Sequence, residues 1–535
     1  MSFNPRVSAE DSLALPADHV QAVQKRQRRI VVQHDVHDVL MGYAKRHGTD
    51  APFQPFRDAV FAYIDDPKTQ IDAVWLDAMG ITVGSVYPSE VLPPVDFSLL
   101  KNWLSQGTDW IAELISGARQ RKLEVIWNHR ISDVDGKPEG GLEMEHLHPL
   151  KAAHPDWVIP VKFWWQGMWN LAAPGLREYK LKVLRELVQK YPLDGVQIDF
   201  SRHVPCLPPG RQWELRGEVT EFMRMVRTMG LEEGARRGRP VLVAAKVPET
   251  LAGCRMDGFD VETWAKLKLV DILTLGSRTM DVEVERFREI VGDAIQLQPC
   301  FDDHHATDGY RHLPIEGLRG VFANHWQRGA NSVVTFNWGT GRPELCSEIG
   351  CEVGSASQEE AYREVGSLAT MAGKNKVFAV ERRGGYPWAE GYFNRNDTAP
   401  LPAALTGGPL VLPLQISDAP AKDSALTIRM ILWDAREGVT PELKLNGEAL
   451  AIVRRDPSWK DPQIFSPKPQ PTSGGVGNYK VDPRQRLLLV ECDTTVWKQG
   501  RNELSITVLN QNGENDGKSV PVHLEKLEAH LRYGG

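Results

Sequence analysis

The chain contains the sequence Leu193-Asp194-Gly195-Val196-Gln197-Ile198-Asp199-Phe200-Ser201-Arg202-His203, an apolar run that ends in polar side chains. Apolar residues at helical spacing precede it over residues 174–191 and follow it over residues 213–229, which predicts a buried strand between two helices. In parallel α/β folds, functional side chains gather at the carboxyl ends of the strands. Asp199, Arg202 and His203 therefore occupy a position typical of catalytic groups, and a structural role for Asp199 in capping the next loop is the alternative.

The same alternation of strand and helix extends from about residue 30 to residue 338. Eight candidate strands fall at residues 30–33, 73–76, 123–127, 195–200, 241–245, 270–275, 295–299 and 332–336. Eight strands with intervening helices over roughly 300 residues match a (β/α)₈ TIM barrel, an α/β fold. The rival fold is an open doubly wound sheet, which calls for a Gly-rich phosphate-binding turn after an early strand, and the sequence has none.

Beyond Trp338 the pattern changes to short alternating segments at residues 426–433, 442–445, 487–490 and 504–508. Two hairpin turn signals, Asn446-Gly447 and Asn512-Gly513, accompany them. This pattern of short strands and turns predicts a C-terminal β-sandwich domain. The expected organisation is an N-terminal extension (1–29), a catalytic (β/α)₈ barrel (30–375) and a β-sandwich accessory domain (376–535).

Composition and charge exclude several classes of protein. The chain has 535 residues, 41% of them hydrophobic, and a formal net charge of -7, so it offers no basic surface for nucleic acid. Its six cysteines lack a CxxC spacing or a disulfide framework. Neither a run of about 18 apolar residues nor a signal peptide is present, so no membrane partner is expected. The expected location is the cytoplasm, or the periplasm or exterior if a signal peptide has been removed.

Polar residues follow most of the predicted strands, and in a barrel they meet at one mouth. The candidate catalytic residues are three carboxylates: Asp199, Glu249 and Asp302. The candidate substrate-binding residues are His34, Asp35, Glu90, Asn128, His129, Trp164, Trp165, Arg202, His203, Lys246, Asp303, Asn337 and Trp338. Indole rings beside carboxylates suit the apolar faces and hydroxyl groups of sugars, which favours a carbohydrate substrate. In the alternative, Trp164 and Trp165 only pack their loop onto the barrel.

Three segments resemble the bacterial family 10 glycosylhydrolase-like barrel proteins: Glu124-Val125-Ile126-Trp127-Asn128-His129-Arg130, Leu176-Arg177-Glu178-Tyr179, and Tyr191 to Phe200. The resemblance covers most of residues 30 to 340 and implies a (β/α)₈ barrel that acts on polysaccharide fragments. The strand that ends in Asp199, with the Asn128-His129 pair, is also similar to the α-amylase type. That similarity implies that Asp199 is the nucleophile and that a glutamate of the next strand is the acid/base. Gln197 replaces an arginine of that type, and Ser201 stands where chitinases have their catalytic glutamate.

These residues support three hypotheses. In the first, a retaining glycoside hydrolase uses Asp199 as nucleophile and Glu249 as acid/base, with Asp302 in reserve for either role and no cofactor or metal. In the second, a metal-dependent barrel hydrolase uses histidines and carboxylates such as His34, Asp35 and His37 as ligands. The third is a non-catalytic carbohydrate-binding protein. Basic residues near the predicted mouth (Arg130, Arg202, Lys246 and Arg278) indicate an anionic sugar substituent or pair with the carboxylates.

Overall fold

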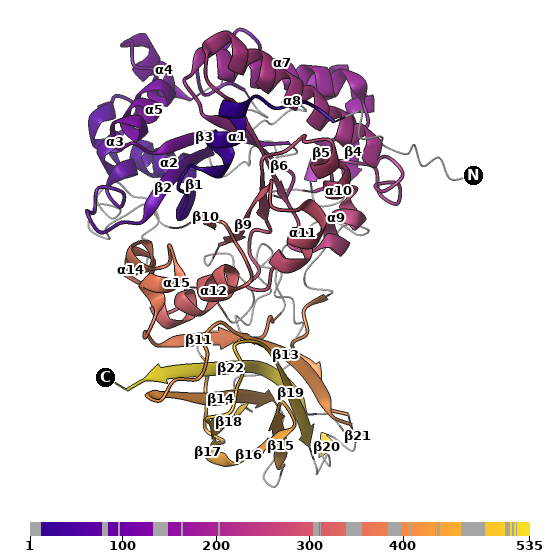
Figure 1. Ribbon diagram of the computed structural model, residues 1–535. Helices are drawn as coiled ribbons and strands as arrows, with labels where there is room; N and C mark the ends of the chain where they lie inside the picture. The colour runs from indigo at the N-terminus through magenta and orange to yellow at the C-terminus, as the bar shows by residue number, and fades with distance from the viewer. Residues whose placement is uncertain are drawn as a thin grey trace.

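A computed structural model describes residues 12–77, 84–94, 97–131, 148–161, 164–201, 204–302, 310, 312–336, 338, 356–382, 398–406, 408–433, 435, 439–461, 487–508, 514–515, 518–519 and 522–534. The side chains of residues 34, 35, 37, 38, 164, 514, 515, 518 and 519 are outside that description. Figure 1 shows two parts, a helix-rich N-terminal part and a C-terminal part built from strands, with α12 (Ile315–Gln327) and β11 (Lys376–Ala379) between them.

The N-terminal part is a closed barrel of eight parallel strands in the order β1-β10-β9-β8-β7-β6-β3-β2. The strands are β1 (Ile30–Asp35), β2 (Ile71–Asp77), β3 (Glu124–Arg130), β6 (Gly195–Asp199), β7 (Leu242–Val247), β8 (Ile272–Leu275), β9 (Gln296–Phe301) and β10 (Val333–Phe336). The predicted TIM barrel is therefore confirmed. In the register of this sheet, Asp199 lies beside Arg130 on one side and beside Lys246 on the other.

Helices surround the barrel and bury an apolar stripe against its outer face. They include α2 (Val36–His47), α3 (Phe53–Phe61), α4 (Ser98–Ser105), α5 (Trp110–Gln120), α7 (Pro174–Lys190), α8 (Arg216–Arg237), α9 (Leu251–Asp257), α10 (Val261–Lys266) and α11 (Val284–Val291). In α7, Leu176, Val183 and Leu187 recur at helical spacing and are fully buried. Between β3 and α7 the chain forms α6 (Pro149–Ala153), the 3₁₀ turn Pro155–Trp157 and a hairpin of β4 (Val158–Val161) with β5 (Trp164–Trp169).

The helix α1 (Ala17–Gln24) closes the amino-terminal end of the barrel. Its Val23 packs on the apolar cluster inside the strands. His19 of this helix lies 3.0 Å from Asp271, which directly precedes β8, and Arg227 of α8 lies 2.8 Å from the same carboxylate. Burial alone would raise the pKa of Asp271, but the charge of Arg227 and the hydrogen bond to His19 outweigh it and lower the pKa to about 2. A buried charged cluster of His19, Asp271 and Arg227 thus joins α1 and α8 to the amino-terminal end of β8.

The C-terminal part contains antiparallel sheets. One has the order β11-β22-β14-β18-β17, with β22 at His523–Tyr533, β14 at Ser424–Trp433, β18 at Leu487–Thr494 and β17 at Ile452–Asp456, and β12 (Ala403–Ala404) pairs with β22. The other has the order β13-β19-β15-β16, with β13 at Leu410–Ile416, β19 at Gly500–Val508, β15 at Pro441–Leu445 and β16 at Glu448–Leu450. A short pair, β20 (Glu514–Asn515) with β21 (Lys518–Ser519), completes the described strands of this part.

The C-terminal strands contain all four segments predicted from sequence, and they add β13 and β22. Buried residues of both larger sheets, such as Ile428 and Leu504, belong to one apolar cluster. Asn446 and Gly447 connect β15 to β16, and both have the positive φ that a two-residue hairpin turn requires. The Asn512-Gly513 signal lies outside the described residues.

Helix α12 joins the two parts closely. A side chain at Gly320 would overlap the backbone carbonyl of Val377 in β11, so the absence of a Cβ lets helix and strand touch. Gln415 of β13 adds two polar contacts, donating to Gln327 at 2.6 Å and accepting at its backbone oxygen from Asn324 at 3.1 Å. Among the helices that the structure describes, none has the length and apolar character to cross a membrane.

Candidate active site

Two buried carboxylates, Asp77 and Asp199, lie close together at the carboxyl ends of β2 and β6. Gln33 Nε2 donates to Asp77 Oδ2 at 3.0 Å and to Asp199 Oδ2 at 3.3 Å. Asn128 Nδ2 donates to the same two oxygens at the same distances. Because both oxygens share these donors, they are no more than about 6.3 Å apart.

Each of these carboxylates has a cation beside it. Arg130 Nε lies 2.9 Å from Asp77 Oδ1 and 3.1 Å from Oδ2. Lys246 Nζ lies 3.9 Å from Asp199 Oδ2, donates to Gln33 at 3.1 Å, and is 3.8 Å from the ring centre of Phe336. Cations at this range favour the ionised form of a carboxyl group. Each carboxylate of the pair therefore has a positively charged side chain within 4 Å in a buried setting.

Neutral side chains inside the barrel extend this arrangement across β3, β6, β8 and β9 and on to Ser332, just before β10. Gln197 Nε2 donates to Asn128 Oδ1 at 2.6 Å, and its Oε1 accepts from Thr274 at 2.6 Å. Gln298 donates to Thr274 at 2.7 Å and accepts from Ser332 at 3.0 Å. Such a connected network fixes the orientation of each amide, and with it the two donors that face the carboxylates.

Two further carboxylates, Glu249 and Asp302, are buried at the same end of the barrel. Arg278 Nε lies 3.6 Å from Asp302 Oδ2, and both side chains are buried. Glu249 follows β7 and lies against Gly276, where a Cβ would come within 2.9 Å of the Glu249 Cβ. The φ of Gly276 is +72°, a conformation that favours glycine. Four carboxylates and three cations thus gather at the carboxyl ends of the strands.

The structure places the residues predicted from sequence as follows. Asp199, Asn128 and Lys246 share one hydrogen-bonded network, and Glu249 and Asp302 are buried at the same end of the barrel. His129 is fully buried and, because side chains alternate along a strand, points to the opposite face of β3 from Asn128.

The other predicted residues that can be placed lie apart from that network. Trp165 of β5 is 59% exposed. Trp338 is buried and packs on the rings of Phe322 and Tyr362. Glu90 is an exposed loop residue whose backbone N–H donates to Glu186 of α7 at 2.5 Å. Arg202, His203, Asp303 and Asn337, with the side chains of His34, Asp35, His37 and Trp164, are outside the described residues.

Asp77 and Gln33 are the residues that the candidate set from sequence lacks. Both lie in predicted barrel strands or directly at their ends, which was the available signal, yet nothing local distinguishes them from polar residues that solvate an edge. Arg130 and Arg278 pair with Asp77 and Asp302, which agrees with the pairing alternative for these basic residues. Among the described residues, no group of three or more His, Cys, Asp and Glu side chains could hold a metal ion.

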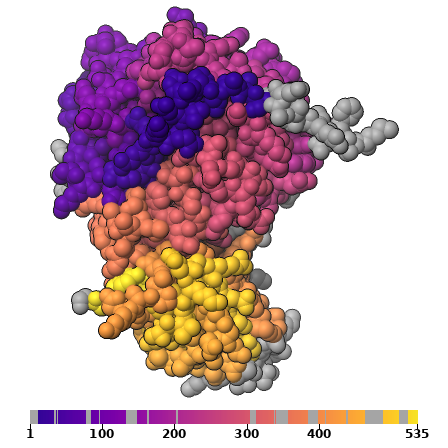
Figure 2. Space-filling model, in the orientation of Figure 1, coloured from indigo at the N-terminus to yellow at the C-terminus, as the bar shows by residue number. Residues whose placement is uncertain are grey.

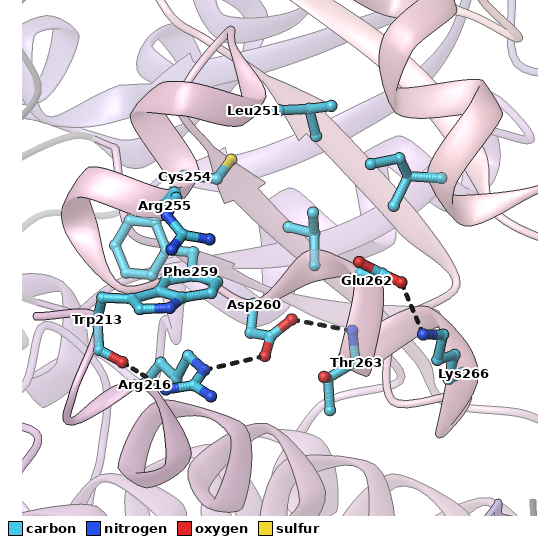
Figure 3. A pocket seen from close by; sticks show the side chains of 12 residues that line it. Trp213, Arg216, Leu251, Cys254, Arg255, Phe259, Asp260, Glu262, Thr263 and Lys266 are labelled. Carbon is cyan, nitrogen blue, oxygen red and sulfur yellow. Dashed lines mark hydrogen bonds and ion pairs between the residues drawn. The ribbon is translucent and has the colours of Figure 1, made fainter. Parts of the chain in front are cut away.

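A separate hollow of about 760 Å³ lies on the outer side of the barrel among α8, α9, α10 and α11 (Figure 3). Trp213 lies between two guanidinium groups, with Arg216 4.7 Å and Arg255 4.5 Å from its ring centre. Arg216 donates to Asp260 at 3.3 Å. A second ion pair in the wall joins Lys266 to Glu262. The hollow is held together by these internal contacts and is distinct from the paired carboxylates inside the strands.

Comparisons with known proteins bear on the barrel. Residues 57–207 match the family model described as Glycosyl hydrolase-like 10. The match confirms the resemblance predicted from the sequence, and its segment includes β2, β3 and β6, which carry Asp77, Asn128 and Asp199. It also supports the prediction that the chain is a glycoside hydrolase. A comparison with curated proteins found no match.

Several solved structures are similar at low identity. They include α-L-fucosidase isoenzyme 2 from Paenibacillus thiaminolyticus, with 14% identity over 66% of this chain and 51% of that one and a TM-score of 0.38. An α-amylase from Anoxybacillus has 12% identity over 90% of this chain and 97% of that one, with a TM-score of 0.40. The PgaB (BpsB) glycoside hydrolase domain from Bordetella bronchiseptica has 12% identity over 64% and 99%, with a TM-score of 0.36. The chain spans about half the length of the fucosidase, and similarity at this level does not identify a substrate.

Proposed function

We propose that this chain is a glycoside hydrolase that cleaves poly- or oligosaccharides with carboxylates at the mouth of its barrel. The observation that carries the proposal is the pair of buried carboxylates, Asp77 and Asp199, held by the same two amide donors. The segment that matches the glycosyl hydrolase-like family contains both of them. Buried carboxylates that share hydrogen-bond donors at the carboxyl ends of barrel strands lie where the catalytic groups of such barrels gather.

In the proposed reaction, the carboxylate of Asp199 attacks the anomeric carbon while the bond from that carbon to the leaving oxygen breaks. The leaving oxygen takes its proton from the carboxyl group of Glu249. The Glu249 carboxylate then deprotonates a water molecule, which attacks the same carbon and releases Asp199. The two steps retain the anomeric configuration.

The surroundings of Asp199 support its role as the nucleophile. Its Oδ2 accepts hydrogen bonds from two amides and its Oδ1 accepts one from the backbone N–H of Ser201 at 3.0 Å. These bonds and the nearby Lys246 hold the carboxylate in one orientation. Asp77 contacts Arg130 through both oxygens, so we do not assign it the role of proton donor. Its proposed role is to orient Gln33 and Asn128 as a fixed negative charge.

Glu249 is proposed as the acid/base because it is buried and lies just beyond β7, the strand next to β6. Asp302 remains the reserve candidate. A cation such as Arg278 beside a carboxyl group favours the ionised form, which suits a base and does not suit an acid. The exposed indole of Trp165 is proposed to stack on a sugar of the substrate. The C-terminal sheets, which share one apolar core, are proposed to form the predicted β-sandwich.

The proposal is tested first with a panel of neutral and uronate-containing oligosaccharides, in which release of new reducing ends reports cleavage. On any substrate that is cleaved, D199N is expected to lower kcat by at least about a thousandfold, because the nucleophile is lost. Azide should restore turnover of D199A and yield a glycosyl azide of inverted configuration, since it enters the space left by the carboxylate. D77A serves as the matched control and should not respond to azide.

Three results would count against this proposal. Activity of D199N within tenfold of the wild type would remove Asp199 from the mechanism. Loss of activity with a chelator, together with stoichiometric metal by elemental analysis, would favour the metal-dependent hydrolase. Binding of an oligosaccharide without any cleavage would favour the carbohydrate-binding protein.

A further inference from the structure

The segment that follows β8, residues 276–281, contacts two of the candidate catalytic carboxylates. Gly276 packs directly on Glu249, as described above. The carbonyl oxygen of Ser277 accepts a hydrogen bond from the backbone N–H of Asp302 at 2.8 Å, and Arg278 faces the Asp302 carboxylate. The position of this segment therefore sets the positions of Glu249 and Asp302.

The far end of the segment is held by a residue of the C-terminal part. Glu381 Oε2 accepts hydrogen bonds from the backbone N–H groups of Met280 at 2.8 Å and Asp281 at 3.1 Å. Glu381 is only 2% exposed. Hydrogen bonds from backbone N–H groups to a carboxylate are about twice as strong as neutral ones, and burial excludes the water that would compete for them.

Glu381 is itself firmly placed in the C-terminal part. It follows β11, and the preceding Val380 donates its N–H to Leu527 of β22 at 3.0 Å. The next residue, Arg382, forms an ion pair of 2.6 Å with Glu525 of β22, and both side chains are fully buried. The residues on both sides of Glu381 are thus bonded to β22, the neighbour of β11 in the larger C-terminal sheet, so the anchor is not part of a loose linker.

A second barrel loop meets the same sheet. Tyr310, which follows β9, is buried, and Lys526 of β22 lies 4.5 Å from its ring centre. Lys526 also pairs with Asp461 at 3.2 Å. Segment 276–281 and Tyr310 therefore both contact the C-terminal part, and Figure 2 shows the two parts in broad contact. If this contact only joined two domains, it would not need to involve the strand ends that carry the carboxylates.

We infer that Glu381 is a positioning residue of the active site, which holds segment 276–281 so that Gly276 packs on Glu249 and Arg278 faces Asp302. The C-terminal part then completes the catalytic centre of the barrel. The catalytic consequence rests on the proposed function, whereas the positioning itself can be measured without any substrate.

The test uses the full-length chain with three substitutions of Glu381 and one control. E381A removes the hydrogen-bond acceptor. E381D keeps the negative charge on a side chain that is one methylene shorter. E381Q keeps an oxygen within reach of both N–H groups. The control is E442A, at an exposed glutamate of β15. Hydrogen–deuterium exchange of a peptide covering residues 276–282 reports the segment, and kcat and KM on the cleaved oligosaccharide report the site.

We expect exchange at Met280 and Asp281 to rise at least tenfold in E381A and E381D, with β14 unchanged. The kcat of both should fall at least tenfold while KM changes less than threefold, and E381Q should keep most of the wild-type behaviour. Unchanged exchange in E381A, or a kcat equal to that of E442A, would overturn the inference. If E381A does not fold, E381D and E381Q decide by the same criteria. If no glycan is cleaved, the proposed function fails and the exchange result alone decides the positioning.

Discussion

The contact between Gly276 and Glu249 makes a sharp prediction about G276A. An alanine Cβ at this position would lie 2.9 Å from the Cβ of Glu249, whereas carbon atoms prefer separations of about 3.5–4.0 Å. Glu249 must therefore move by at least roughly 0.6 Å. Because a displacement of about 1 Å at a reacting group can cost a factor of about a hundred, kcat should fall by about ten- to a hundredfold.

The matched control for this variant is G238A. Gly238 ends α8 with a φ of +68°, close to the +72° of Gly276, but no atom lies within 4 Å of its Cβ position. Both variants should lose about 1–2 kcal/mol of unfolding free energy from left-handed backbone strain, measured by urea denaturation. Only G276A should lose turnover of the cleaved oligosaccharide. A kcat of G276A within twofold of that of G238A would refute the assignment of Glu249.

Three further predictions concern the other parts of the molecule. W165A should raise KM up to about tenfold through lost stacking, while its unfolding free energy in urea stays within about 0.5 kcal/mol of wild type because Trp165 is largely exposed; an unchanged KM would exclude Trp165 from the binding site. R130M should lower the unfolding free energy by about 3–5 kcal/mol, since it leaves the buried Asp77 without its cation; a loss below about 1 kcal/mol would contradict that pairing. The pKa of Asp271 is lowered from its ordinary 3.8 to about 2 in the folded protein, so this residue contributes about 2 kcal/mol of stability that is present above pH 4 and lost as the pH falls through about 2. Urea midpoints measured across that range should show this loss in the wild type, and D271N should be less stable at neutral pH but lack this acid-dependent loss.

The barrel could be predicted from sequence because each strand and helix carries its own burial pattern. The eight predicted strands all correspond to strands of the closed sheet. The ends of the strands were less predictable. The sequence predicts that the third strand ends at residue 127, because the residues after it are polar, whereas β3 continues through Asn128 to Arg130. These side chains remain in the strand because Asp77, Asp199 and Gln197 satisfy their hydrogen bonds from across the barrel.

The candidate site was predicted in part. Asp199, Asn128 and Lys246 were selected because they follow or end apolar strands, and they do share one network. Asp77 was not selected, since its importance depends on Arg130 and Asn128, which lie 53 and 51 residues away. Glu381 had no signal at all, because nothing near it in sequence indicates that it reaches a loop about a hundred residues earlier.

By itself, the sequence determined the architecture: an eight-stranded barrel, carboxylates at its strand ends, and a C-terminal part made of strands. Those features follow from local periodicity and from the direction of parallel strands. The tertiary structure alone decided which groups meet, as in the contact of Gln33 with Asp199, 166 residues apart, and in the hold of Glu381 on the segment after β8. The reason is that hydrogen bonds and ion pairs act over a few ångströms, and only closure of the barrel and docking of the C-terminal sheet bring such distant residues within that range.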